Sequence, residues 1–150
     1  MKRIASFEVD HTKINKGIYI SRIDGSITTY DLRMKLPNSD DYLENDGIHS
    51  FEHLFATFVR NSQYSENIVY VGPMGCLTGF YFLTSNLDHE SAVKLIIASL
   101  EFIAAYISDI PGVSVVECGN YKLHSLEKAK SYAADFRAAI LKNGDTLSAY

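Results

Sequence analysis

Alternation of apolar and polar residues marks the first third of the chain as β structure. Residues 17–23 and 26–36 form two such runs around the dipeptide Asp24-Gly25. This dipeptide suits a tight hairpin turn, because both of its residues can adopt a positive φ. Pro37 follows the second run and cannot donate to a strand ladder, so we expect the second strand to end there.

Shorter apolar runs predict three further strands. Residues 67–71 and 77–84 lie on either side of a Gly-Pro-Met-Gly turn, and residues 113–117 follow a Pro-Gly pair. Apolar runs of this length that are bounded by turn residues are typical of strands.

Three segments repeat their apolar residues every three or four positions, which predicts amphipathic helices. They cover residues 48–61, 89–107 and 125–142. Asp46 is the expected N-cap of the first helix and Ser125 that of the third, while Pro111 breaks the second. This order of elements predicts an α+β fold, with a mainly antiparallel sheet and three to four helices packed on one face.

Length and composition indicate one globular domain over residues 1–150. Hydrophobic residues make up 47% of the chain and charged residues 21%, with no internal repeat, low-complexity tract or linker. Fourteen basic and eighteen acidic residues give a net charge of −4 without a basic stripe, so we expect no nucleic-acid partner. The longest apolar segment, 93–107, is short and carries two charges, which argues against a membrane span.

Cys76 and Cys118 are the only cysteines, too few for a disulfide framework in a chain of this length. Glu8 and Asp10 interrupt the N-terminal region before an apolar core could form, so we expect no signal peptide and a cytoplasmic protein. In a reducing compartment the two thiols are inert core residues, metal ligands or nucleophiles.

The sequence His-Ser-Phe-Glu-His at 49–53 is the most specific local feature. His49 and His53 are four positions apart on the first predicted helix, so both imidazoles point from one face and can share a metal ion. Glu52 borders that face and can reach a metal-bound ligand. The pattern is H-x-x-E-H, the inverted form of the zinc-protease motif; two surface histidines placed by chance are the alternative.

Candidates for a third ligand lie further along the chain. Cys118 ends the predicted strand 113–117, before a Gly-Asn turn that could aim its thiolate at a helix; a buried, inert cysteine is the alternative. His124 is a competing ligand, although its position before a helix cap also fits a structural role. Cys76 follows Gly-Pro-Met-Gly at a loop-to-strand junction, where a thiol is either exposed and reactive or a small core residue.

Five blocks of the sequence together resemble the S-ribosylhomocysteine lyase (LuxS) family. They begin at residues 6, 30, 49, 72 and 117 and read SFEVDHT, YDLR, HSFEHLFA, GPMGCLTGFY and ECGNYKLHSL. Because they occur in the family's order and cover essentially the whole chain, the resemblance extends to the complete domain.

The resemblance implies metal-assisted aldose–ketose isomerisation of S-ribosylhomocysteine, followed by β-elimination. The products are homocysteine and 4,5-dihydroxy-2,3-pentanedione, the autoinducer-2 precursor. The resemblance further implies one Fe(II) per subunit, with zinc or cobalt able to substitute, and a homodimer with active sites at the interface. The matching positions are His49, His53 and Cys118 for the metal, Cys76 and Glu52 for acid/base catalysis, and Ser6, His11 and Arg33 for the ribose pocket.

Two other interpretations stand beside the lyase. An inverted-zincin peptidase, in which Glu52 would activate water, gives Cys76 no task and normally takes a third carboxylate ligand. A non-catalytic relative that only binds a ribosyl thioether is the second. Tyr70 fits altered specificity, because many family members have an aspartate at this position, six residues before the catalytic cysteine.

Overall fold

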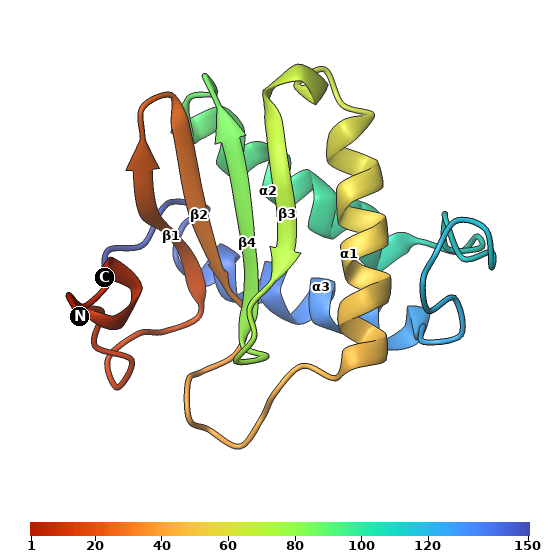
Figure 1. Cartoon of the computed structure of the whole chain (residues 1–150), viewed down its shortest axis with the longest axis horizontal. Helices are drawn as coiled ribbons and strands as arrows, with labels where there is room; N and C mark the ends of the chain where they lie inside the picture. Colours follow the sequence, from red (N-terminus) through yellow and green to blue (C-terminus); the bar gives the residue numbers. More distant parts are fainter.

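The computed structural model describes the chain from residue 1 to residue 150, except for the side chain of Ala5. Four strands form one antiparallel sheet in the order β1-β2-β4-β3, and three α-helices pack against one of its faces (Figure 1). The elements are η1 Ala5–Phe7, β1 Gly17–Asp24, β2 Ile27–Arg33, α1 Asn45–Arg60, η2 Ser65–Asn67, β3 Ile68–Pro73, β4 Gly79–Ser85, α2 His89–Ala105 and α3 Leu126–Lys142. The predicted α+β class is therefore confirmed. None of the described helices has the length and apolar character needed to cross a membrane.

The predicted hairpin of β1 and β2 is present, but its turn lies one residue later than expected. Asp24 pairs with Ile27, so Gly25 and Ser26 form the turn, and Gly25 takes the left-handed conformation at φ 61°. The second strand ends at Arg33 rather than at Pro37. The N–H groups of the next two residues both donate to the carbonyl of Thr78, which turns the chain away from the ladder.

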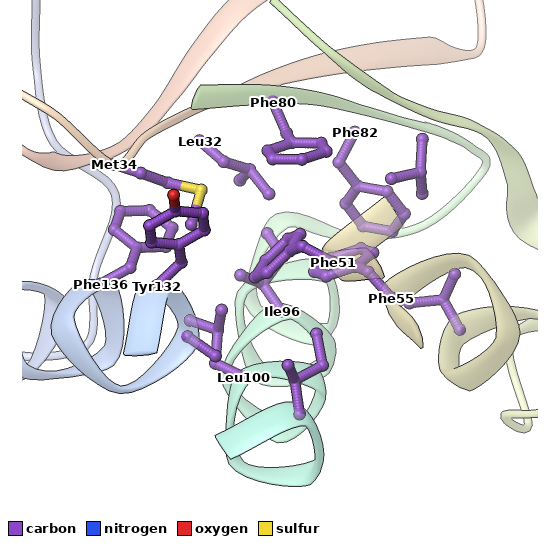
Figure 2. Packing of buried hydrophobic residues seen from close by; sticks show 14 of the residues in the cluster. Leu32, Met34, Phe51, Phe55, Phe80, Phe82, Ile96, Leu100, Tyr132 and Phe136 are labelled. Atoms are coloured by element: carbon purple, nitrogen blue, oxygen red, sulfur yellow. The ribbon is translucent and has the colours of Figure 1, made fainter. Parts of the chain in front are cut away.

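Aromatic side chains join α1 to the sheet in the core (Figure 2). The ring of Phe51 lies 4.8 Å from that of Phe80, and the ring of Phe55 lies 5.4 Å from that of Phe82. All four side chains are fully buried. Because residues 51 and 55 face the sheet, the helical period turns the His49, Glu52 and His53 positions away from β4.

The start of α1 differs from the prediction. The helix begins at Asn45 with Glu44 as N-cap, and Asp46 lies in its first turn. Asp46 instead accepts a hydrogen bond from Lys128 Nζ at 2.9 Å, and this partner holds the pKa of Asp46 below its usual value. The prediction considered only local capping, whereas a contact from α3 decides the role of Asp46. The predicted cap of α3 is confirmed, because the Ser125 side chain accepts from the N–H of Lys128.

The predicted strand at 113–117 is wrong. These residues form turns, in which the N–H groups of Glu117 and Cys118 both donate to the carbonyl of Ser114. Val115 and Val116 are 71% and 91% exposed. The apolar run therefore packs against no sheet in this chain, and burial of one face is what an apolar run needs to become a strand.

Candidate functional site

Four potential metal ligands converge where α1 meets the connection between α2 and α3. His49 and His53 come from α1, and Cys118 and His124 come from that connection. One ligand atom from each of these residues lies within 4.8 Å of the other three. The sequence predicts Cys118 or His124 as the third metal ligand, and the structure brings both into one cluster.

Hydrogen bonds fix the tautomers of the two helical histidines. His49 Nδ1 lies 2.8 Å from the carbonyl oxygen of Leu123, and His53 Nδ1 lies 2.8 Å from that of Pro111. A carbonyl oxygen can only accept, so each Nδ1 must carry the proton. Both Nε2 atoms are therefore left with a free lone pair, which is the arrangement that metal-binding histidines show.

His124 is held in the same tautomer by the hydroxyl of Ser50. Ser50 Oγ donates its single proton to the carbonyl of Asp46 at 3.0 Å and accepts from the N–H of Ser125 at 2.8 Å. Its 3.1 Å contact with His124 Nδ1 must therefore be a bond that the imidazole donates. Burial, followed by the neighbouring His49 and His53, lowers the pKa of His124 to about 4. The imidazole is thus neutral near pH 7 and offers Nε2 as a donor.

The donor set fits a divalent transition metal. Cys118 Sγ lies 3.4 Å from His49 Nε2 and 4.0 Å from His124 Nε2. Three imidazole nitrogens and one thiolate form a set that Zn²⁺, Fe²⁺ and Co²⁺ all accept. No carboxylate belongs to the cluster among the described residues, whereas a peptidase of the inverted-zincin type normally takes one as its third ligand.

Cys76 lies in the loop between β3 and β4. The sequence predicts it at the start of the second of these strands, but β4 begins only at Gly79. Its thiol is free and exposed, which agrees with the reactive alternative rather than the core one. Thr78 Oγ1 lies 3.0 Å from the sulfur and accepts from Arg33 Nη1 at 2.6 Å, so its own proton is free for the sulfur. Arg33 Nη1 itself lies 3.9 Å from the sulfur. A thiolate at this position would therefore face both a hydroxyl donor and a cation.

Arg33 stays charged although it is buried. Burial opposes the charge, but Asp31 at 2.6 Å, and Cys76, raise the pKa of the guanidinium above its ordinary value. The ion pair is almost completely shielded, with side-chain exposures of 4% for Arg33 and 2% for Asp31. The guanidinium beside Cys76 therefore keeps its positive charge and is held in place by its ion pair with Asp31.

The three predicted pocket residues, Ser6, His11 and Arg33, lie together. Ser6 and His11 line a small cavity of about 20 Å³ together with Arg33. His11 and Arg33 also line a wider cavity of about 300 Å³ that contains Cys76. Residues of the small cavity that the sequence analysis missed are Val9, Ser21, Asp31, Tyr81 and Tyr150.

Comparison with known proteins assigns the chain to a family. A family model described as S-Ribosylhomocysteinase (LuxS) matches residues 4–146. The chain belongs to the LuxS family. It is 47% identical to the S-ribosylhomocysteine lyase of Borreliella burgdorferi over 150 residues, covering 95% of this chain and 94% of the relative. It is 46% identical to that of Borreliella afzelii and 41% identical to that of Desulfotalea psychrophila, each over 149 residues with the same coverage.

The structure places most of the predicted site residues of this LuxS domain either in the cluster of potential metal ligands or in two cavities. The structure brings His49, His53 and Cys118 into one cluster, and it brings Ser6, His11, Arg33 and Cys76 to neighbouring cavities. Glu52 is partly buried on α1 between the two helical histidines. Tyr70 is exposed on β3, and its ring lies over Gly72, where any side chain would collide with it.

Proposed function

We propose that this chain is an S-ribosylhomocysteine lyase, a carbon–sulfur lyase, as its curated relatives are named. It would convert S-ribosylhomocysteine into homocysteine and 4,5-dihydroxy-2,3-pentanedione. The observation that carries the proposal is the pairing of a His/Cys metal cluster with an exposed thiol beside a buried arginine, within a chain of the LuxS family.

The reaction needs a group that stabilises negative charge on the sugar oxygens, and the His/Cys cluster can hold a metal ion for this purpose. The sugar carbonyl must move from C1 to C2 and then to C3 before the thioether can leave by β-elimination. Each shift removes a proton from a carbon next to a carbonyl and passes through an enediolate. A divalent metal at the cluster supplies Lewis-acid stabilisation of that negative charge. Fe(II), one per subunit, is the proposed metal, and zinc or cobalt satisfies the same donors.

Two bases serve the proton transfers. The Cys76 sulfur, with Thr78 and Arg33 beside it, would take a proton from one sugar carbon and return it to the next. Glu52, which lies on the metal-binding helix, would do the same for the second shift and protonate at the leaving end. Ser6, His11 and Arg33 would hold the sugar hydroxyls in the cavities that they line.

A homodimer with shared active sites is part of the proposal. Among the described residues, those that line the Cys76 cavity include no member of the metal cluster. The connection that carries Cys118 exposes Ile107, Val115 and Val116, which suits contact with a second copy. Each site would then combine the cluster of one subunit with the Cys76 cavity of the other.

The cellular setting follows from the thiols and the products. Both cysteines must stay reduced to act, which favours the cytoplasm. There the reaction would recycle homocysteine in the methyl cycle, and the second product, as the autoinducer-2 precursor, would serve quorum sensing.

The decisive test is release of free thiol from S-ribosylhomocysteine. Protein purified without oxygen and loaded with Fe(II) is expected to release one thiol per substrate, and the chelated protein is expected to release none. No thiol from folded, metal-loaded protein would contradict the lyase and direct attention to other ribosyl thioethers, with Tyr70 as the residue to examine first.

Glu52→Gln is expected to retain metal and lose turnover. The amide keeps the size of the carboxylate but cannot accept a proton, so kcat should fall by roughly 10²–10⁴-fold, the range of general acid/base catalysis. Thiol release and bound metal per chain are the measurements. Glu66→Gln, an exposed residue of η2, is the matched control and should keep the wild-type rate. A rate within a few-fold of wild type for Glu52→Gln would remove Glu52 from the mechanism.

A further inference from the structure

Asp31 and Arg33 form a buried ion pair on one face of β2. They lie two positions apart on the strand, so both side chains leave the same face. Tyr30 and Leu32, which alternate with them, point to the other face and belong to the hydrophobic core. The pair is almost fully buried, and Arg33 Nη1 lies 3.9 Å from Cys76 Sγ. The geometry of this ion pair therefore decides which charge the thiol faces.

The carboxylate and the guanidinium are joined through one carboxylate oxygen. Asp31 Oδ2 accepts from Arg33 Nη2 at 2.6 Å. Among the described residues, Asp31 Oδ1 and Arg33 Nε have no hydrogen-bond partner. A carboxylate and an arginine often form two parallel hydrogen bonds, and that arrangement is the stronger one. A further contact is therefore needed to keep Asp31 out of the two-bond arrangement.

The hydroxyl of Tyr150 supplies this contact. It donates to Asp31 Oδ2 at 2.9 Å, so the oxygen lies between two donors, Tyr150 and Arg33. Partial burial and the neighbouring Asp31 raise the pKa of Tyr150, so its hydroxyl keeps the proton that it donates. With Asp31 held in this way, Arg33 Nη1 donates to Thr78 Oγ1 at 2.6 Å and stays beside the sulfur of Cys76.

Tyr150 reaches the ion pair because the segment before it docks on β1. The N–H of Ser148 donates to the carbonyl of Ile18 at 2.7 Å. The Tyr150 ring stacks on Tyr19, with ring centres 4.6 Å apart and planes 12° from parallel. Gly17 permits this approach, because a side chain there would collide with Ser148. Backbone pairing and stacking therefore hold the tyrosine in place, although about half of it is exposed.

We propose that Tyr150 is a positioning residue for the Cys76 thiolate and acts through Asp31 and Arg33. Its hydroxyl restricts the carboxylate to a single hydrogen bond with Arg33, which leaves more of the guanidinium charge available to the sulfur. Without the hydroxyl, the carboxylate can turn and pair Oδ1 with Nε as well. The guanidinium would then be neutralised more fully and would attract the thiolate less. The inference rests on the proposed function in taking Cys76 as the reacting thiol.

Tyr150 affects the thiol without carrying a charge itself. Besides Cys76, the titratable side chains that line the two cavities are Asp31, Arg33, His11, Tyr42, Tyr81 and Tyr150. Arg33 is permanently charged, and Asp31 is its counter-ion. Burial raises the pKa of Tyr81, so this hydroxyl stays neutral. Tyr150→Phe exchanges one neutral group for another, so an effect on the thiol would come from the way Asp31 and Arg33 pair.

The test measures the reactivity of Cys76 without substrate. Wild type and Tyr150→Phe are alkylated with iodoacetamide at pH 7 and at pH 10. Mass spectrometry of the peptide that contains Cys76 separates its reaction from that of Cys118. Because the thiolate is the reactive form, the rate at pH 7 relative to pH 10 reports how well the protein stabilises it. We expect Tyr150→Phe to lower this ratio roughly two- to tenfold, the range that corresponds to the loss of one hydrogen bond.

Tyr19→Phe is the matched control for the stacked segment. It keeps the ring beneath Tyr150 and loses only a hydroxyl that donates to the carbonyl of Asn15, so it should give the wild-type ratio. An unchanged ratio for Tyr150→Phe would overturn the inference. An equal loss in both variants, or an equal slowing at both pH values, would also overturn it, because either result indicates general loosening of the segment.

The thiol-release assay separates this inference from the proposed function. At pH 7, Tyr150→Phe should lower kcat and leave KM unchanged, whereas an effect on KM alone would overturn the positioning role. Failure of the proposed function looks different, because wild-type protein would then release no thiol from S-ribosylhomocysteine, whatever the alkylation ratios are.

Discussion

Cys76→Ala is expected to abolish thiol release from S-ribosylhomocysteine while leaving the metal content unchanged. The side chain is exposed and lies outside the His49, His53, Cys118 and His124 cluster, so its removal neither opens the core nor takes a ligand away. In the proposed mechanism, the reaction then loses the base whose sulfur lies beside Thr78 and Arg33. A general base contributes roughly 10²–10⁴-fold to the rate, so kcat should fall by at least that factor. Measurements are thiol release, bound metal per chain and the midpoint of thermal unfolding.

A serine at this position distinguishes chemistry from packing. Cys76→Ser restores most of the volume and the contact with Thr78, but a hydroxyl yields its proton far less readily than a thiol. We expect it to be as inactive as Cys76→Ala, with an unchanged unfolding midpoint. If either variant kept more than a tenth of the wild-type rate, the proton transfers would have to be assigned to other groups.

His53→Ala is expected to lose metal and activity together. The variant removes one of four converging donors, and it also removes the bond from Nδ1 to the carbonyl of Pro111. Loss of an outer-sphere partner alone lowers metal affinity by roughly 10–100-fold, and loss of a ligand should exceed that. Metal per chain after dialysis is the direct readout. Chelator should lower the unfolding midpoint of the wild type and leave that of His53→Ala unchanged, because a metal stabilises only the state that binds it.

His89→Ala is the control for this experiment. His89 begins α2, and its Nδ1 contacts the hydroxyl of Tyr30 at 2.7 Å, so it takes no part in the cluster. We expect it to retain metal and activity. Retention of a full metal complement by His53→Ala would mean that His49, Cys118 and His124 suffice to hold the ion.

The fold could be read from the sequence wherever an apolar period coincides with a buried face. The strands around Gly25 and the helices with stripes at 48–61 and 125–142 satisfy that condition, and the structure confirms them within a few residues. The segment 113–117 has the composition of a strand, but its valines are exposed and no sheet edge receives them in this chain. Local pattern cannot reveal whether a partner strand exists.

The site could be predicted to the extent that its residues share one element. His49 and His53 lie one helical turn apart, so their spacing alone indicates a joint ligand. The contact between Tyr150 and Asp31 joins residues 119 positions apart, and the contact between Ser50 and His124 spans 74. These partners are set by how the β1 edge and the start of α3 pack, which no short motif records.

The bonds that orient the three imidazoles have a consequence for folding. His53 and His49 hold the backbone at Pro111 and Leu123, and Cys118 lies between these two points on the connection from α2 to α3. A bound ion would therefore cross-link α1 to this connection. It would close a loop between His49 and Cys118, which are 69 residues apart. By the chain-entropy model for cross-links, closing a loop of that size lowers the conformational entropy of the unfolded chain. At 25 °C this corresponds to about 4 kcal/mol of stabilisation of the folded state. An ion bound there for the proposed reaction would thus also maintain the shape of the connection that carries two of its ligands.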